Sequence, residues 1–216
     1  MSKINDFYRD GYSLDEPLPA LLSNFFHAQV RADNYIDDGH GTCLIAEWES
    51  DLPSENLNIP SQYLNLMKNL SSGSEISKWL QVRFGEFSRI NVMLQKSKPG
   101  HEMDWHYDGL DPMHLVCMIY LTENEWDERD GGQLLIGEGD CNEIGLIDDT
   151  SAVRQIAAIS PAPGRVVWTL NTNPRQLHKV TAVRTDQKER YVLIGQFGYR
   201  ENAENTKVKE HIAGWR

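Results

Sequence analysis

HLVCMIYLTENEWDERDGGQLLIG, residues 114–137, is the stretch that decides the fold. Two β-rich apolar runs, 114–122 and 131–137, flank an acidic segment that ends in paired glycines. Short apolar runs bounded by turn residues are typical of strands. The stretch therefore predicts two strands joined by a polar connection.

Similar runs occur on both sides of this stretch, each bounded by Gly, Pro or Asp. They cover residues 88–96, 103–108, 164–170, 177–183 and 190–199. Seven short strands separated by turn residues indicate an antiparallel sandwich or jelly roll. We expect a mainly β fold of the double-stranded β-helix (jelly roll) type.

The part before residue 85 has a different texture and is predicted to be mostly helical. One helix is expected to open at Pro19, with Leu21, Leu22, Phe25 and Phe26 recurring at the spacing of an apolar stripe. A second is expected to start at Ser61 and to end before the SSGS breaker at 71–74. Helices followed by strands predict a sandwich with one sheet buttressed by N-terminal helices.

Length and patterning predict a single domain over residues 1–216. Residues 1–85 form its mostly helical part, 86–200 the double-stranded β-helix core that carries the active site, and 201–216 a tail. The connection 137–163 is longer than an ordinary hairpin loop. It is interpreted either as a lid or as a plain surface excursion.

Composition excludes several classes of protein. Hydrophobic residues make up 40% and charged residues 25%, as in ordinary globular domains. The net charge of −11, without a Lys/Arg cluster, argues against nucleic acid as a partner. No apolar run is long enough to span a membrane, and the polar, acidic N-terminal segment has no basic region followed by an apolar one, so secretion is not expected. A cytoplasmic location and reduced cysteines are expected.

The chemistry begins at His106-Tyr107-Asp108. Residues i and i+2 of a strand point to the same face, so this imidazole and carboxylate can converge on one cation. His178, 70 residues after Asp108, would complete a 2-His-1-carboxylate triad, the ligand set of non-haem Fe(II) oxygenases. An H-x-D pattern alone is common by chance, and a lone His is more often structural, so the surrounding strands carry the argument.

Arg190 opens the last strong strand, twelve residues after His178. A guanidinium at this position can hold a carboxylate through two parallel hydrogen bonds, which Lys cannot match. Arg184 is a rival, but it precedes the polar turn 185–188 and is expected to be solvated. Taken alone, Arg190 would be interpreted as a surface charge at a strand start.

At this point residues 88–199 resemble the prolyl-4-hydroxylase-like branch of the Fe(II)/2-oxoglutarate-dependent dioxygenases. Four elements in family order carry the resemblance: His106-x-Asp108 after a Gly-containing turn, the segment 118–136, the segment PGRVVWTLN at 163–171, and the segment 177–199 with His178 and Arg190. The resemblance implies a hydroxylase whose iron and 2-oxoglutarate bind inside the open end of the β-helix, with O₂ as the oxidant and succinate and CO₂ as products.

Carried over residue by residue, the resemblance makes His106, Asp108 and His178 the iron ligands. It implies that Arg190 pairs with the distal carboxylate of 2-oxoglutarate, and that the Tyr120 hydroxyl also reaches that carboxylate. An aromatic packed in the core is the competing interpretation of Tyr120. Some family members have Ser or Thr two residues after the arginine, whereas this chain has Val192.

The substrate is less constrained. Asp104 alternates with His106 and Asp108, so in a regular strand it would face the barrel mouth and favour a cationic or amine-bearing substrate; a cap on the preceding turn is the alternative. Trp105 is a second candidate substrate contact, or a core residue. Three functions are weighed: hydroxylation of a small molecule such as an amino acid or biosynthetic intermediate, hydroxylation of a peptidyl substrate in a partner protein, and a non-catalytic jelly-roll metal-binding or sensing domain.

Overall fold

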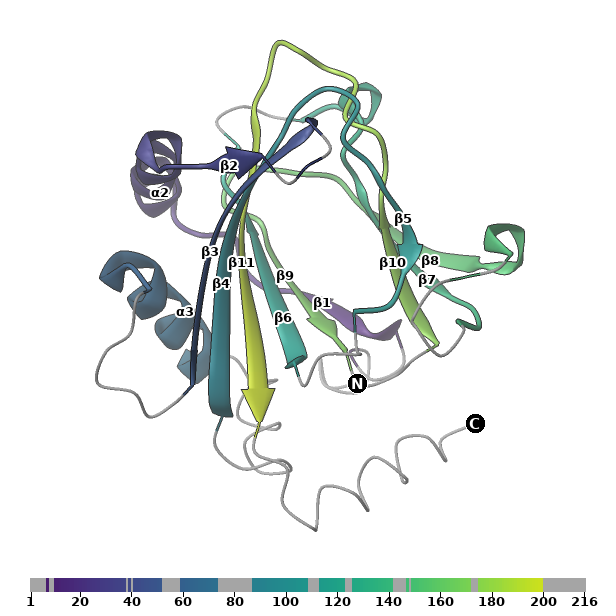
Figure 1. The fold of residues 1–216 in the computed structure, drawn as a ribbon, viewed down its shortest axis with the longest axis horizontal. Helices are drawn as coiled ribbons and strands as arrows, with labels where there is room; N and C mark the ends of the chain where they lie inside the picture. Colours follow the sequence, from purple (N-terminus) through teal and green to yellow (C-terminus); the bar gives the residue numbers. More distant parts are fainter. Residues whose placement is uncertain are drawn as a thin grey trace.

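In the computed structural model, two antiparallel sheets face each other, and two helices cover the outside of the larger one (Figure 1). The structure describes residues 7, 10–37, 39, 41–51, 59–73, 87–108, 113–122, 126–141, 147, 149–171 and 175–199. Within these residues, the helices are α2 (Ala20–Ala32) and α3 (Ser61–Gly73), with short 3₁₀ turns at Glu128–Asp130 and Thr150–Ala152. None of the described helices is both long and apolar enough to cross a membrane.

Among the described residues, the larger sheet has seven strands and the smaller has four. The larger sheet has the order β1 (Tyr12–Leu14), β9 (Val166–Leu170), β6 (Met113–Tyr120), β11 (Arg190–Tyr199), β4 (Phe87–Ser97), β3 (Cys43–Asp51) and β2 (Ile36–Asp37). The smaller has the order β5 (Met103–His106), β10 (Gln176–Val180), β7 (Leu134–Glu138) and β8 (Arg154–Ile159). This arrangement is the expected double-stranded β-helix with N-terminal helices on one sheet.

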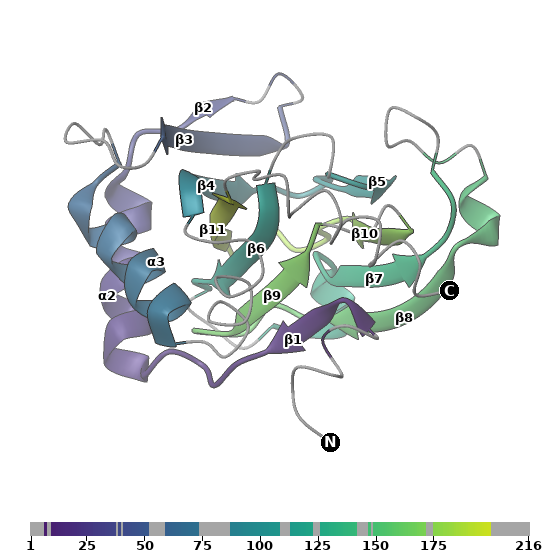
Figure 2. The same cartoon turned by 90° about the horizontal axis from the view of Figure 1, so that it is seen from below.

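The central strands of the larger sheet divide their side chains between two cores, because alternate residues point to opposite faces. On β4 and β11, residues such as Ile90, Leu94 and Leu193 pack with Phe26 and Met67 of the helices. The residues between them face the smaller sheet, where an inner cluster joins the two sheets. That cluster contains Tyr120, Leu134, Ile136, Ile159, Val167, Val180 and Val192. The helices therefore stabilise the larger sheet from outside, on the face turned away from the smaller sheet (Figure 2).

All seven predicted strands are present, and two further findings correct the sequence analysis. The first 85 residues are less helical than predicted, because they also contain β1, β2 and the nine-residue β3. The connection 137–163 is not wholly irregular either, since β8 lies within it and pairs with β7. Residues 142–146 and 148 of that connection, and the tail 201–216, lie outside the described residues.

Both predicted helices form, but with different details. Pro19 is the N-cap of α2, as expected, whereas α3 continues through the serines predicted to break it. The buried face of α2 consists of Ser23, Phe26, His27 and Val30. Leu21, Leu22 and Phe25 are 83%, 43% and 49% exposed, so most of the apolar stripe predicted for this helix points away from the core.

Candidate active site

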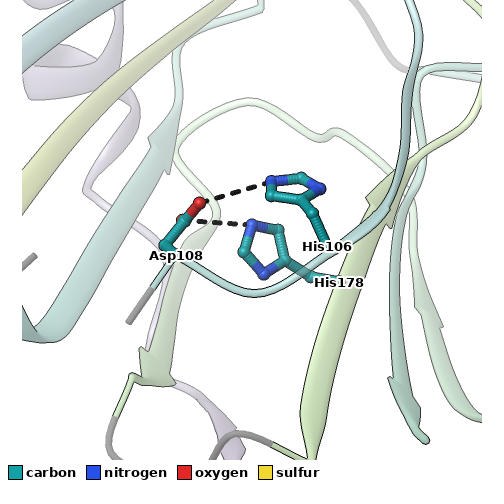
Figure 3. Close-up of side chains that lie close together, drawn as sticks. All are labelled: His106, Asp108 and His178. Carbon is teal, nitrogen blue, oxygen red and sulfur yellow. Dashed lines mark ion pairs between the residues drawn. The ribbon is translucent and has the colours of Figure 1, made fainter. Parts of the chain in front are cut away.

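Three side chains converge between the sheets: His106, Asp108 and His178 (Figure 3). His106 is the last residue of β5 and pairs directly with His178 on β10. Asp108 follows β5 by two residues, beyond the end of the strand. One ligand atom from each residue lies within 4.8 Å of the others. Residues that are 70 positions apart in the sequence thus form one compact cluster with the chemistry of a facial triad.

The carboxylate of Asp108 faces both imidazoles, whose ring centroids are 4.1 Å apart (Figure 3). Its Oδ1 is 3.4 Å from His106 Nε2, and its Oδ2 is 3.2 Å from His178 Nε2. Burial alone would raise the pKa of Asp108, but His178 and His106 outweigh it and hold this pKa below its usual range. Asp108 is therefore ionised at neutral pH and supplies the negative ligand that a divalent cation needs.

The orientation of His106 suits a metal ligand. Its Nδ1 lies 2.6 Å from the Asp104 carbonyl oxygen, which fixes Nδ1 as the protonated nitrogen. Nε2 is then the nitrogen left for a metal; it is buried and points toward the Asp108 carboxylate. A ring held by a backbone carbonyl with the other nitrogen aimed at the cluster is the usual arrangement of a metal-bound histidine. The residues present therefore fit an Fe(II) ion.

Arg190 lies at the start of β11, on the face that points toward the smaller sheet, and is only 2% exposed. Its Nε donates to the Gly132 carbonyl at 3.0 Å, and its Nη1 donates to Ser97 Oγ at 3.1 Å. A longer contact of 3.4 Å joins Nη1 to the Gln95 amide oxygen. All of these partners are uncharged, and no partner for Nη2 is seen among the described residues. A buried cation with uncharged neighbours favours binding of an anion.

Tyr120 lies beside this cation, with its ring centroid 5.3 Å from the Arg190 guanidinium carbon. The side chain is fully buried, and no partner for its hydroxyl is found within the described residues. Burial raises the pKa of Tyr120, and the Arg190 charge opposes that rise without cancelling it. The hydroxyl thus stays protonated and can donate a hydrogen bond. Together the two side chains fit the distal carboxylate of 2-oxoglutarate.

The rival Arg184 is exposed, as predicted. Its backbone N–H donates to the carbonyl of Asp130, the last residue of the 3₁₀ turn at Glu128–Asp130. Val192, which stands where some family members have Ser or Thr, is 2% exposed and packs in the inner cluster with Tyr120. It offers no hydrogen bond to a cosubstrate.

The expected role of Asp104 at the barrel mouth is wrong. Its side chain is 66% exposed and pairs with Lys179 Nζ at 2.9 Å. The register explains this, because His178 pairs with His106 whereas Val180 pairs with Met103. Two residues of β5, Asp104 and Trp105, thus oppose Lys179 alone, and such a bulge breaks the alternation on which the prediction depended.

The same bulge moves Trp105 away from the mouth. A Cβ placed on Gly137 would lie 2.8 Å from the Trp105 ring and 2.7 Å from Val153. Gly137 pairs with Leu177, which lies next to His178 and therefore on the opposite, outer face of the smaller sheet. Trp105 is thus a packing residue on that face, and its interpretation as a substrate contact is corrected.

Gly132 is part of the site but was not identified from the sequence. It has a φ of 66°, and a Cβ at this position would lie 2.9 Å from Arg190 Cδ. Only glycine allows both the left-handed backbone and this close approach. The paired glycines at 131–132 carry this signal, but the sequence pattern assigns them only to the end of the connection between two strands.

Comparison with known proteins agrees with this geometry. Residues 90–198 match the family described as the 2OG-Fe(II) oxygenase superfamily. Comparison with curated proteins finds no significant match.

Several solved structures share the fold. A Pseudomonas putida prolyl-4-hydroxylase is 21% identical, with a TM-score of 0.61 over 92% of this chain and 98% of that chain. HygX from Streptomyces hygroscopicus, solved with nickel and 2-oxoglutarate bound, is 10% identical, with a TM-score of 0.62 over 94% and 88%. The viral collagen prolyl hydroxylase of Paramecium Bursaria Chlorella virus-1 is 15% identical, with a TM-score of 0.54 over 88% and 97%.

The family match covers half of the chain and includes all three triad residues, Arg190 and Tyr120. The fold, the triad geometry and the match agree. The chain therefore belongs to the 2OG-Fe(II) oxygenase superfamily, and it is an oxidoreductase whose cofactors are Fe(II) and 2-oxoglutarate.

Proposed function

We propose that this enzyme hydroxylates an unactivated C–H bond of a small molecule, such as an amino acid or a biosynthetic intermediate. In this proposal His106, Asp108 and His178 hold the iron, and Arg190 with Tyr120 holds 2-oxoglutarate. The carrying observation is the placement of the three ligand atoms within 4.8 Å of one another on the inner side of the sandwich. O₂ is the oxidant, and bound Fe(II) and 2-oxoglutarate would supply the chemistry that activates it: one oxygen atom would enter the substrate and the other succinate, with release of CO₂.

The protein's own residues then have separate tasks. The Asp104 carbonyl keeps the His106 ring in one tautomer. Arg190 is itself held by Gly132 and Ser97, so its remaining N–H groups are preorganised for a carboxylate. The apolar side chains of the inner cluster, among them Val192 and Ile136, exclude water from the region between the triad and Arg190.

The alternative is a peptidyl substrate. Two of the structural neighbours are named prolyl hydroxylases, but at 21% and 15% identity they share the fold with this chain and do not fix its substrate. The small-molecule and peptidyl substrates can be distinguished by a direct assay of oxygenated products.

The test incubates the purified chain with Fe(II), 2-oxoglutarate and O₂, first alone and then with amino acids or proline-containing peptides. Succinate and products that have gained one oxygen atom are measured by mass spectrometry. Without an added substrate, we expect succinate but no oxygenated product. With added compounds, we expect oxygenated products from amino acids or related small molecules and none from the peptides. Oxygenation of peptides alone would favour the alternative, and no succinate under any condition would contradict both.

A further inference from the structure

Three polar side chains form a row across the larger sheet: Glu47 on β3, Asn91 on β4 and Gln196 on β11. Asn91 and Gln196 are direct partners in the β4–β11 register. Asn91 Nδ2 donates to the Glu47 carboxylate at 2.6 Å and to Gln196 Oε1 at 3.0 Å. We call these three residues the polar row.

The polar row faces the same space as the triad. Gln196 shares its face with Val192, because they lie four residues apart on β11, and Val192 belongs to the inner cluster. Glu47 pairs with Met93, which lies two residues from Asn91 and so on the same face. On the opposite sheet, His178 shares its face with Val180 of that inner cluster.

The row also lies toward the same end of the barrel as the triad. The connection 181–189 joins β10 to β11 at the end where Arg190 lies. With increasing distance from that connection, the order on β10 is Val180 and then His178, and the order on β11 is Val192 and then Gln196. Substrate entering from the end that is opposite Arg190 would pass the polar row on its way to the iron.

Asn91 leaves an acceptor unused inside this space. Its side chain is 8% exposed, and no partner for its Oδ1 is found within the described residues. The orientation of the amide is fixed, because a carboxylate accepts hydrogen bonds only and so requires Nδ2 on the Glu47 side. A buried carbonyl oxygen without a partner is uncommon in folded proteins and calls for a donor from elsewhere.

We propose, building on the proposed function, that the polar row binds an ammonium or guanidinium group of the substrate. Glu47 supplies the opposite charge, since its carboxylate can accept several hydrogen bonds and Asn91 uses one. Asn91 Oδ1 supplies a second acceptor. The row therefore presents a carboxylate and a carbonyl oxygen to the same donor, which favours a cation over a neutral or anionic group.

The experiment compares matched probes in the uncoupled assay. Succinate formation is measured with free L-amino acids and polyamines, and then with derivatives in which every amino group is acetylated. Cationic probes are expected to stimulate succinate formation above the rate without substrate, at concentrations about tenfold or more below those of their acetylated forms. Equal stimulation by both forms, or none by any cationic probe, would overturn the proposal.

Variants connect the effect to the row. Glu47→Gln keeps the size of the side chain and its hydrogen bond from Asn91 but removes the charge. It should raise the concentration of cationic probe needed for half-maximal stimulation about tenfold or more. Asp186→Asn, an exposed charge in the connection at the other end, is the matched control and should leave that concentration unchanged. An unchanged concentration in Glu47→Gln would also overturn the proposal.

The assay separates the two hypotheses. If the wild-type protein forms succinate but does not distinguish cationic from acetylated probes, the proposed function stands and the proposed role of the polar row is refuted. If the wild-type protein forms no succinate with Fe(II) and 2-oxoglutarate, both the proposed function and the proposed role of the polar row are refuted.

Discussion

Replacing Arg190 with Lys removes the planar fork and keeps the positive charge. In the structure, Nε and Nη1 are already used by Gly132 and Ser97, and Nη2 remains for 2-oxoglutarate. An ammonium reaches the same region with a single nitrogen, so at least one hydrogen bond to the carboxylate is lost. A hydrogen bond to a charged group contributes about 1.5–3 kcal/mol. At about 1.4 kcal/mol for each factor of ten, KM for 2-oxoglutarate should rise about tenfold to a hundredfold.

The assay is succinate formation as a function of 2-oxoglutarate concentration at saturating Fe(II). Arg184→Lys is the matched control, because Arg184 is exposed in the connection that leads to Arg190 and is not among the groups that shift the pKa of Tyr120. Thermal denaturation of the apo-protein would show whether Arg190→Lys remains folded. An unchanged KM in a folded Arg190→Lys variant would refute the reasoning, and a rise in Arg184→Lys instead would transfer the role to Arg184.

Three further substitutions test neighbouring parts of the site. Tyr120→Phe should raise KM for 2-oxoglutarate by about tenfold or less, since one buried hydroxyl donor is lost while the Arg190 charge remains; an unchanged value would make Tyr120 a packing residue. Gly132→Ala should raise the same KM by displacing Arg190, whereas Gly39→Ala, which also has a positive φ but has nothing within 4 Å of its Cβ, should not. Equal KM values in the two alanine variants would contradict this. Trp105→Ala should lower the free energy of unfolding by about 2–4 kcal/mol in urea denaturation and leave that KM unchanged; a large change in KM would restore Trp105 to the active site.

The strands could be predicted because each has an apolar, β-rich pattern bounded by turn residues. β3 was missed because CLIAEWESD mixes Ala and two glutamates into the strand, and its burial depends on packing against β4 and the helices. β8 was missed for a similar reason. It is an edge strand of the smaller sheet, and its first two residues are exposed.

The triad could be predicted because His106 and Asp108 are only two residues apart and therefore stay close together even though β5 ends at His106. The prediction for Asp104 failed because one extra residue in β5 reverses the face on which it lies. The bulge is visible only in the pairing of β5 with β10, and no residue in the sequence of β5 marks it. The polar row was also beyond reach from sequence, since Glu47, Asn91 and Gln196 become neighbours only through the registers of three strands.

Iron content and succinate formation in the triad variants test the central claim most directly. Purified wild-type protein, His106→Ala, Asp108→Ala and His178→Ala would be loaded with Fe(II) without oxygen, dialysed, and assayed with 2-oxoglutarate and air. The structure predicts that the wild type retains iron and forms succinate, while each variant stays folded, loses iron and forms none. Full succinate formation by His178→Ala would contradict the assignment of the triad.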